Sequence, residues 1–135
     1  SKFSKAKKII GIEINEKAHK YAMENAIINK LNNVEFYKGD VNKVVPKLNE
    51  KFDRITMPLP KTSVTYLPLA LKYIKPGGII HFYDFSEEYK IPQSTTTKIE
   101  KACNKSKKSF KILKITKCGQ QSPRVYRVCA DFQTR

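Results

Sequence analysis

The ten residues Phe52-Asp-Arg-Ile-Thr-Met-Pro-Leu-Pro-Lys61 decide the fold of this chain. Residues 52–57 form an apolar, strand-like run, the prolines at 58 and 60 end it, and a helix-like pattern follows. In an open parallel sheet, ligands bind in the crevice beyond the carboxyl ends of the strands. We therefore expect the turn at 58–60 to lie at a binding site.

The residues on either side of this turn alternate between predicted strands and predicted helices. Short β-branched runs and alternating patterns predict strands at 8–14, 34–37, 52–57, 78–83, 110–117 and 125–132. Helical spacing predicts helices at 16–30, 41–48, 62–73 and 94–108, with Asn15 capping the first and Thr62 or Ser63 the third. A break is expected at 76–78, and loops at 86–92 and 118–123. This order predicts an α/β fold, a doubly wound sheet with an antiparallel pair at its C-terminal end, in one domain over residues 1–135.

The composition is that of a globular chain without a membrane or secretory segment. Of its 135 residues, 40% are hydrophobic. No apolar run approaches the roughly 20 residues that span a bilayer, and the basic start lacks the apolar stretch of a signal peptide. The three cysteines are too few and too scattered for a disulfide framework, and none forms a C-x-x-C pair that binds zinc. We therefore expect a reducing, cytoplasmic setting and no metal site.

Positive charge is the strongest compositional signal. The chain has 27 basic and 12 acidic side chains, which gives a net charge of +15. Residues 90–135 alone hold twelve basic residues and two acidic ones, a surplus of ten positive charges. A field of that sign attracts phosphate backbones, so it favours a nucleic-acid partner. The alternative is that lysine serves solubility in a lysine-rich proteome.

Two acidic residues end consecutive predicted strands. Glu13 closes the first strand, where a carboxylate can accept both hydroxyls of a ribose while Ile14 packs on the attached adenine. Asp40 follows the second strand, next to Val41, where it could accept from the adenine amino group. Each acid also has a simpler interpretation: Glu13 can face water, and Asp40 can be a turn residue or a helix cap. Together the two acids favour a nucleoside site.

The turn at 58–60 is rigid, because proline fixes φ and removes an amide donor. Pro58, Leu59 and Pro60 could therefore aim backbone carbonyls at the exocyclic amino group of a base. The simpler interpretation is a connector between a strand and a helix. Lys61 beside the turn could neutralise a phosphate, or it could be solvated.

Other polar residues give weaker signals. Ser122, Arg124 and Arg127 lie where a loop enters the last predicted strand, and the two arginines can fork onto phosphates. Tyr126 could stack on a base or pack against the neighbouring strand. His81 lies in an apolar strand, which is more typical of a satisfied core or edge histidine than of a catalytic base. The sequence has no pattern of a catalytic triad, a metal cluster or a P-loop.

Together these residues resemble the archaeal and eukaryotic tRNA guanine-37 N1-methyltransferases, a family close to the wybutosine-pathway aminocarboxypropyl transferases. The likeness covers residues 12–15 and the following helix, 34–40, 53–61, 77–83, 122–124 and 131–132. It implies a Rossmann-like class I methyltransferase sheet, S-adenosylmethionine as cofactor and tRNA as partner. It also implies that Glu13, Ile14, Asp40 and Val41 hold the nucleoside half of the cofactor, and that residues 57–60 form the target-base loop.

Two departures from the family pattern matter. Many members have Asn where Pro58 stands, so base recognition here would rest on backbone carbonyls or on other residues. The first sheet strand, the glycine-rich cofactor loop, the acid proposed as general base and the RNA-docking domain have no counterpart in residues 1–135. The missing strand would lie between the strands at 8–14 and 52–57, so we expect unpaired edges there or direct pairing of those strands. We also expect a missing N-terminal segment or another copy to complete the sheet, and little catalysis without it.

The predicted function is methyl transfer from S-adenosylmethionine to N1 of guanine 37 in tRNA, as part of a longer or split enzyme. Two alternatives remain open. The first is aminocarboxypropyl transfer to a wybutosine precursor, against which the Pro-Leu-Pro turn argues, since those relatives usually lack it. The second is a non-catalytic RNA-binding remnant, an alternative that the missing glycine-rich loop supports.

Overall fold

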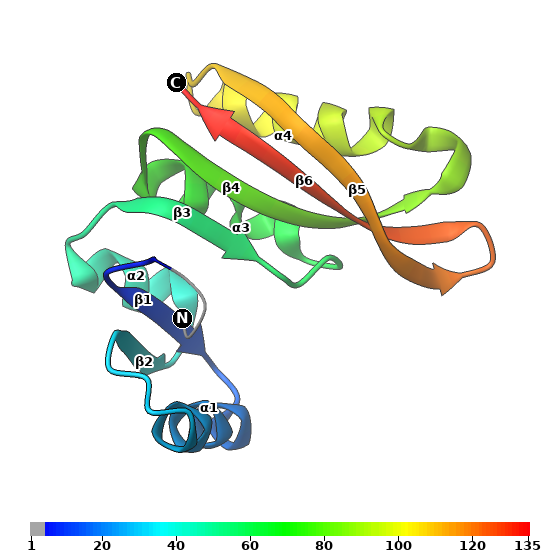
Figure 1. Cartoon of the computed structure of the whole chain (residues 1–135). Helices are drawn as coiled ribbons and strands as arrows, with labels where there is room; N and C mark the ends of the chain where they lie inside the picture. Colours follow the sequence, from blue (N-terminus) through cyan, green and yellow to red (C-terminus); the bar gives the residue numbers. More distant parts are fainter. Residues whose placement is uncertain (1–4) are drawn as a thin grey trace. The chain divides into compact units, whose positions relative to one another are not determined.

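The computed structural model describes residues 5–135, and the chain divides into two compact units, Ser1–Asn49 and Glu50–Arg135 (Figure 1). Strands and helices alternate in the predicted order, apart from one added turn of 3-10 helix before the last α-helix. Each unit has its own sheet.

The first unit is a β-α-β-α segment on a two-stranded parallel sheet. Its strands are β1 (Ile9–Glu13) and β2 (Val34–Lys38), and its helices are α1 (Glu16–Ile28) and α2 (Val41–Leu48). The strands pair from Ile9 opposite Val34 to Glu13 opposite Lys38. Because the strands are parallel, both carboxyl ends lie at the same edge of this sheet.

Two residues explain the local geometry of the first unit. The side chain of Asn15 accepts a hydrogen bond of 3.1 Å from the backbone nitrogen of Ala18, which confirms the predicted cap of α1. Gly11 lies in β1 against the ring of Phe36 in β2, and a Cβ at position 11 would come within 2.6 Å of that ring. Only glycine therefore allows this close approach.

The second unit contains a four-stranded mixed sheet in the order β3-β4-β6-β5. Its elements are β3 (Phe52–Met57), α3 (Ser63–Tyr73), β4 (Ile74–Glu87), the 3-10 helix η1 (Glu88–Lys90), α4 (Gln93–Lys105), β5 (Phe110–Ser122) and β6 (Val125–Thr134). Strands β3 and β4 are parallel, whereas β6 runs antiparallel to both β4 and β5. The antiparallel C-terminal pair was predicted from its alternating pattern.

The core of the second unit lies between the sheet and the two helices α3 and α4, which Figure 1 shows together behind the sheet. Alternate residues of β4 and β6 point into this core. The fully buried core side chains are Leu67, Leu71, Ile74, Ile80, Phe82, Ile99, Cys103, Ala130 and Phe132. The intervening residues of β4 and β6 therefore face away from the helices and are available for polar contacts.

Strand β4 is longer than predicted. It begins at Ile74, directly after α3, and ends at Glu87, so it includes the first two residues of the loop expected at 86–92. The break predicted at 76–78 is instead an irregularity inside the strand, where the register with β3 shifts between Phe52 and Arg54 and Gly77 adopts a φ of 78°. Glycine tolerates that conformation, so residues 76–78 form a bulge within the strand and do not end it.

One further boundary was wrong, and one expected capping bond is absent. Strand β5 continues to Ser122, so the predicted connection at 118–123 shrinks to a tight turn at Pro123 and Arg124. Three register shifts along β5 disturb its alternation, which hides the strand from a period-two pattern. At the start of α3, neither predicted cap is formed: Thr62 makes no capping side-chain bond, and Ser63 Oγ donates to the carbonyl of Pro60 at 3.2 Å.

Strands β1 and β3 belong to different sheets. Within residues 5–135, β1 pairs only with β2, and β3 only with β4. Of the two arrangements expected from the sequence, unpaired edges are therefore the one observed. None of the helices in this part of the chain is long and apolar enough to cross a lipid bilayer.

Candidate active site

Four predicted cofactor residues meet at one edge of the first unit. Glu13 ends β1 opposite Lys38, the last residue of β2. The backbone nitrogen of Gly39 then donates to the carbonyl of Glu13 at 3.0 Å, which fastens the chain leaving β2 to the end of β1. Ile14 and Val41 follow the two acids Glu13 and Asp40, so all four lie at the carboxyl edge of the parallel pair.

Glu13 and Ile14 present a carboxylate beside an apolar surface. One carboxylate oxygen of Glu13, Oε1, accepts a hydrogen bond of 2.7 Å from the backbone nitrogen of Asn15. Its other oxygen, Oε2, has no hydrogen-bond partner among residues 5–135. The side chain of Ile14 is 69% exposed, although it is large and apolar. This pairing fits a nucleoside, which offers ribose hydroxyls to an acid and a flat base to an apolar surface.

Asp40 is a helix cap, as the simpler interpretation of the sequence predicted. Its Oδ1 accepts from the backbone nitrogen of Asn42 at 2.9 Å and from the Asn42 side-chain amide at 3.2 Å. Both bonds use the same oxygen. Within the described part of the chain, Oδ2 makes no hydrogen bond. Oδ1 can therefore cap the helix while Oδ2 accepts a hydrogen bond from a ligand.

The turn at 58–60 lies in the second unit, at the carboxyl end of β3. Met57 is buried, whereas Pro58 is exposed and Leu59 is 62% exposed. The carbonyl of Leu59 accepts from the backbone nitrogen of Thr62 at 3.3 Å, and that of Pro60 accepts from Ser63 Oγ at 3.2 Å. Among the described residues, nothing donates to the carbonyl of Pro58. Of the three carbonyls expected to meet a base, Pro58 thus offers the free one.

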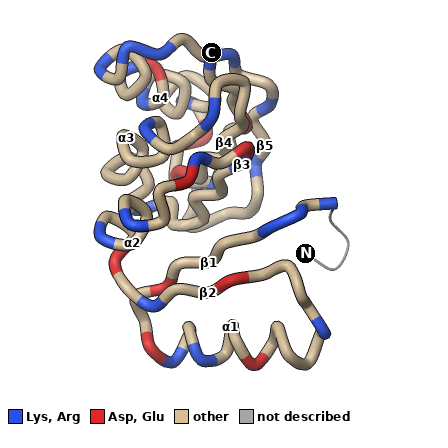
Figure 2. The backbone as a smooth tube through the Cα atoms, turned by 90° about the vertical axis from the view of Figure 1, so that its left-hand side faces the viewer, with Lys and Arg blue, Asp and Glu red and all other residues tan. Residues whose placement is uncertain are grey.

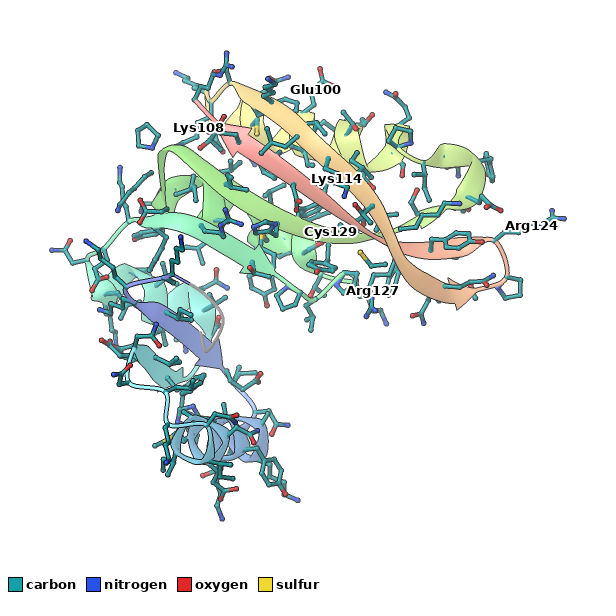
Figure 3. All side chains as sticks on the ribbon, in the orientation of Figure 1. Glu100, Lys108, Lys114, Arg124, Arg127 and Cys129 are labelled. Carbon is teal, nitrogen blue, oxygen red and sulfur yellow. The ribbon has the colours of Figure 1, made fainter. Side chains whose placement is uncertain are left out.

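Two of the four predicted RNA-binding residues lie at the β5–β6 turn. Ser122 is the last residue of β5, not part of a loop, and Arg124 is exposed in the turn (Figure 3). Arg127 lies further along β6, where its guanidinium donates to the carbonyl of Cys118 at 3.2 Å. Lys61 is exposed beside the turn at 58–60, and none of the salt bridges described for residues 5–135 involves it.

Figure 2 shows a group of basic residues around the end of α4 and the start of β5, near the C-terminus. The basic residues there are Lys101, Lys105, Lys107, Lys108, Lys111 and Arg135. The backbone nitrogen of Arg135 donates to the carbonyl of Ser109 at 2.9 Å, which holds the end of β6 beside the start of β5. We call these six residues the α4-end cluster.

Sequence reasoning missed a polar network on the face of the second sheet opposite the helices. It joins Arg54 of β3, His81 of β4 and Asp131 of β6: Arg54 Nη1 lies 3.0 Å from His81 Nε2, and His81 Nδ1 lies 2.6 Å from Asp131 Oδ1. A guanidinium can only donate, so Nε2 accepts, and Nδ1 carries the proton that it donates to Asp131. Both ring nitrogens of His81 thus have partners, in agreement with the interpretation of His81 as a satisfied histidine rather than a catalytic base.

The same network explains why His81, Cys129 and Asp131 are poor metal ligands, although their ligand atoms lie within 4.8 Å of one another. Coordination through Nδ1 would move the proton to Nε2, where it would face the Arg54 guanidinium, another donor. Burial, reinforced by the hydrogen bond to Asp131, raises the pKa of the Cys129 thiol to about 12. A cysteine binds a metal as the thiolate, so the arrangement fits a hydrogen-bond network better than a metal centre.

Comparison with known proteins settles the family. A model of the TRM5/TYW2 methyltransferase domain matches residues 1–113. The chain belongs to this family. The match confirms the resemblance seen in the sequence.

Individual TRM5/TYW2 relatives agree in sequence and in fold. The tRNA (guanine(37)-N(1))-methyltransferase Trm5b of Pyrococcus abyssi is 33% identical over 96% of this chain and 38% of its own length, and its crystal structure superposes with a TM-score of 0.87. The TYW2 structure from M. jannaschii, in complex with AdoMet, gives a TM-score of 0.88 at 26% identity, over 98% of this chain and 60% of that chain. The structure of aTrm5 with tRNALeu gives 0.82 at 29% identity, over 95% of this chain and 35% of that chain.

These similarities establish a Rossmann-like α/β methyltransferase fold, as predicted. The chain spans about two fifths of the length of the curated Trm5b relatives that it matches, 38% of one and 35% of another. The TRM5/TYW2 domain is therefore shown for this chain, whereas the activity of the whole relatives is not transferred by the match alone.

Proposed function

We propose that this chain contributes the nucleoside-binding acids and the target-base loop to an enzyme that methylates N1 of guanine 37 in tRNA. Membership of the TRM5/TYW2 family carries the proposal, and the Trm5b relative with 33% identity specifies the reaction. The complexes of a TYW2 relative with AdoMet and of aTrm5 with tRNALeu support the cofactor and the substrate.

S-adenosylmethionine supplies a methyl group on a positively charged sulfur. We assign its ribose hydroxyls to the free Oε2 of Glu13 and its adenine to the exposed surface of Ile14 and to Val41. The free Oδ2 of Asp40 accepts from the adenine amino group. An adenosine offers two vicinal hydroxyls, a flat ring and one amino group, and these residues provide one partner for each.

On the substrate side, the carbonyl of Pro58 accepts from the exocyclic amino group of the target guanine. The bonds from Thr62 and Ser63 hold the loop, so the loop positions the base without reorganising. Lys61 neutralises a neighbouring phosphate, and the basic residues of the second unit bind the RNA backbone, Arg124 and Arg127 among them. The group that removes the N1 proton lies outside this set.

The transfer reaction itself tests the proposal. Two samples are incubated with S-adenosylmethionine and a tRNA that carries guanine 37. The first contains the chain alone. The second also contains the part of a Trm5b relative that precedes its region of similarity to this chain. Guanine methylated at N1, detected by nucleoside mass spectrometry, is the expected product when the segments are added, and little of it is expected from the chain alone. Asp40→Asn keeps the helix cap and removes the charge, so it should lower the rate without unfolding α2.

Aminocarboxypropyl transfer is the second candidate, and one observation favours it. The TYW2 structure superposes as well as Trm5b does, with TM-scores of 0.88 and 0.87, although its identity of 26% is lower than the 32% for Trm5b. The two reactions add groups of different mass to a base at the same tRNA position, so the mass of the product decides between them.

A non-catalytic RNA-binding role is the third candidate, from a different class. The basic surplus of residues 90–135 is the feature that favours it. Tight, salt-sensitive tRNA binding together with no affinity for S-adenosylmethionine under any of the conditions above would select this candidate and reject both enzymes.

A further inference from the structure

The short helix η1 is fastened to the tip of the β5–β6 hairpin. The backbone nitrogen of Glu88 donates to the carbonyl of Arg124 at 2.8 Å, and Lys117 Nζ lies 2.9 Å from Glu88 Oε1. The first bond joins η1 to the turn between β5 and β6, and the second joins η1 to β5. Tyr89, Lys90, Lys117 and Arg124 therefore belong to one surface, which we call the hairpin-tip surface.

Tyr89 is the aromatic residue of this surface. Its side chain is 78% exposed, the highest value among the large apolar and aromatic side chains of the described residues. The ammonium of Lys90 lies 5.0 Å from the centroid of its ring. A ring with a cation on one face and solvent on the other is a stacking platform for a flat, electron-rich partner.

Arg124 occupies a position where arginine is conformationally costly. Its φ is 60°, in the left-handed region that glycine and asparagine prefer. The hydrogen bond from Glu88 holds this conformation, and Figure 3 shows the side chain at the hairpin tip, directed away from the ribbon. An arginine that is held in an unfavourable backbone conformation and keeps its charge in solvent indicates a role in binding an anion.

The acids near the hairpin-tip surface are already neutralised. Glu87 pairs with Lys90 at 2.6 Å, and Glu88 pairs with Lys117 at 2.9 Å. One positive charge, that of Arg124, therefore remains in excess. The surface thus combines an exposed aromatic ring with an uncompensated guanidinium group, the two components by which proteins bind single-stranded nucleic acid.

We propose that the hairpin-tip surface binds unpaired nucleotides that flank the target base, with one base stacked on Tyr89 and one phosphate held by Arg124. The inference rests on the proposed function. Phe82 of β4 pairs with Met57 at the start of the target-base loop, and Glu88 follows six residues later, directly after the end of β4. At about 3.3 Å per residue this span is about 20 Å, or about six stacked nucleotides.

The test compares RNA affinities of the full chain and its variants. The probe is a fluorescein-labelled RNA stem-loop whose loop carries the target guanine, titrated at several salt concentrations. Tyr89→Ala should raise Kd about tenfold, whereas Tyr89→Phe, which keeps the ring, should change it less than about twofold. The matched control is Tyr21→Ala, which removes a 60% exposed tyrosine from α1 and should also change Kd little.

Arg124→Gly completes the test, because glycine fits the turn without strain and only the guanidinium is lost. It should weaken binding and lower the salt slope by about 0.7, the value for one phosphate of a single strand. If the wild-type chain binds the RNA but Tyr89→Ala and Tyr21→Ala have the same Kd, the inference is wrong and the proposed function stands. The same conclusion follows if Arg124→Gly leaves the salt slope unchanged. No RNA binding by the wild-type chain would overturn both the inference and the proposed function.

Discussion

Lys98 reaches from α4 to a buried carboxylate on β4: its Nζ lies 2.8 and 2.7 Å from Oδ1 and Oδ2 of Asp84. Asp84 is only 3% exposed, and Thr95 Oγ1 donates to the same Oδ2 at 3.0 Å. The pair therefore ties the helix to the sheet at a point where an uncompensated charge would be costly.

Lys98→Ala leaves Asp84 without its cation and should lower the free energy of unfolding by about 2 kcal/mol, less than for a fully buried pair because Lys98 is partly exposed. The measurement is urea unfolding followed by circular dichroism. Lys101→Ala, an exposed lysine on the same helix, is the control and should change stability by less than about 0.5 kcal/mol. Equal stability of the two variants would show that the pair contributes nothing.

Gly11→Ala tests the close approach of β1 and β2. Its Cβ would lie 2.6 Å from the Phe36 ring, so we expect a loss of about 1–3 kcal/mol from overpacking. The double variant Gly11→Ala/Phe36→Leu makes room for the methyl group and should recover part of the loss. A single variant as stable as the wild type would contradict the described strand spacing.

The three thiols should differ in reactivity. Burial raises the pKa of Cys103 to about 11 and that of Cys129 to about 12, so both remain protonated at pH 8. Cys118 is only half-buried. A disulfide reagent at pH 8 should therefore modify one thiol quickly in the folded chain and all three in urea. Rapid reaction of all three in the folded chain would contradict the burial.

The same two thiols predict how stability changes at high pH. Their folded-state pKa values, about 11 and about 12, lie above the ordinary 9.0. The stability that they contribute is therefore complete below pH 9 and is lost as the pH rises through their folded-state values. Cys103→Ser should remove part of this alkaline loss. An unchanged profile in that variant would assign the loss to other groups.

The α4-end cluster should bind phosphates. Replacing Lys105, Lys107 and Lys108 by Gln should lower the slope of log K against log salt for tRNA by up to about 2.7, at about 0.9 per phosphate of a duplex. The control replaces Lys17, Lys30 and Lys47 of the first unit. If both triple variants change the slope equally, the effect is one of net charge and not of this cluster.

The sequence predicted the order of elements because the strands at 9–13, 34–38 and 52–57 are short apolar runs bounded by caps and turns. The sequence did not predict features that depend on contacts between strands distant in the chain. The length of β4 depends on its pairing with β6, from Ile79 opposite Gln133 to Glu87 opposite Val125, and no local pattern reports that pairing.

The candidate site was predictable to a similar extent. Glu13 and Asp40 could be proposed as site residues because each follows a strand of a parallel pair, and the carboxyl ends of such strands lie at the same edge. In the Arg54–His81–Asp131 network, strand register brings together hydrogen-bond partners that are 27 and 50 positions apart, so the sequence showed only a lone histidine. Tyr89 lay in a predicted loop, and its exposure depends on how η1 packs on the hairpin.

Calorimetric titration of the chain with S-adenosylmethionine tests the central claim, that the carboxyl edge of β1 and β2 holds the nucleoside half of the cofactor. The account predicts binding that weakens at least about tenfold in Glu13→Ala, because two charge-assisted hydrogen bonds to the ribose are lost. Glu24→Ala, which removes an exposed acid of α1 in the same unit, should bind as the wild type does. Equal affinity of the wild type and Glu13→Ala would contradict the assignment of this edge.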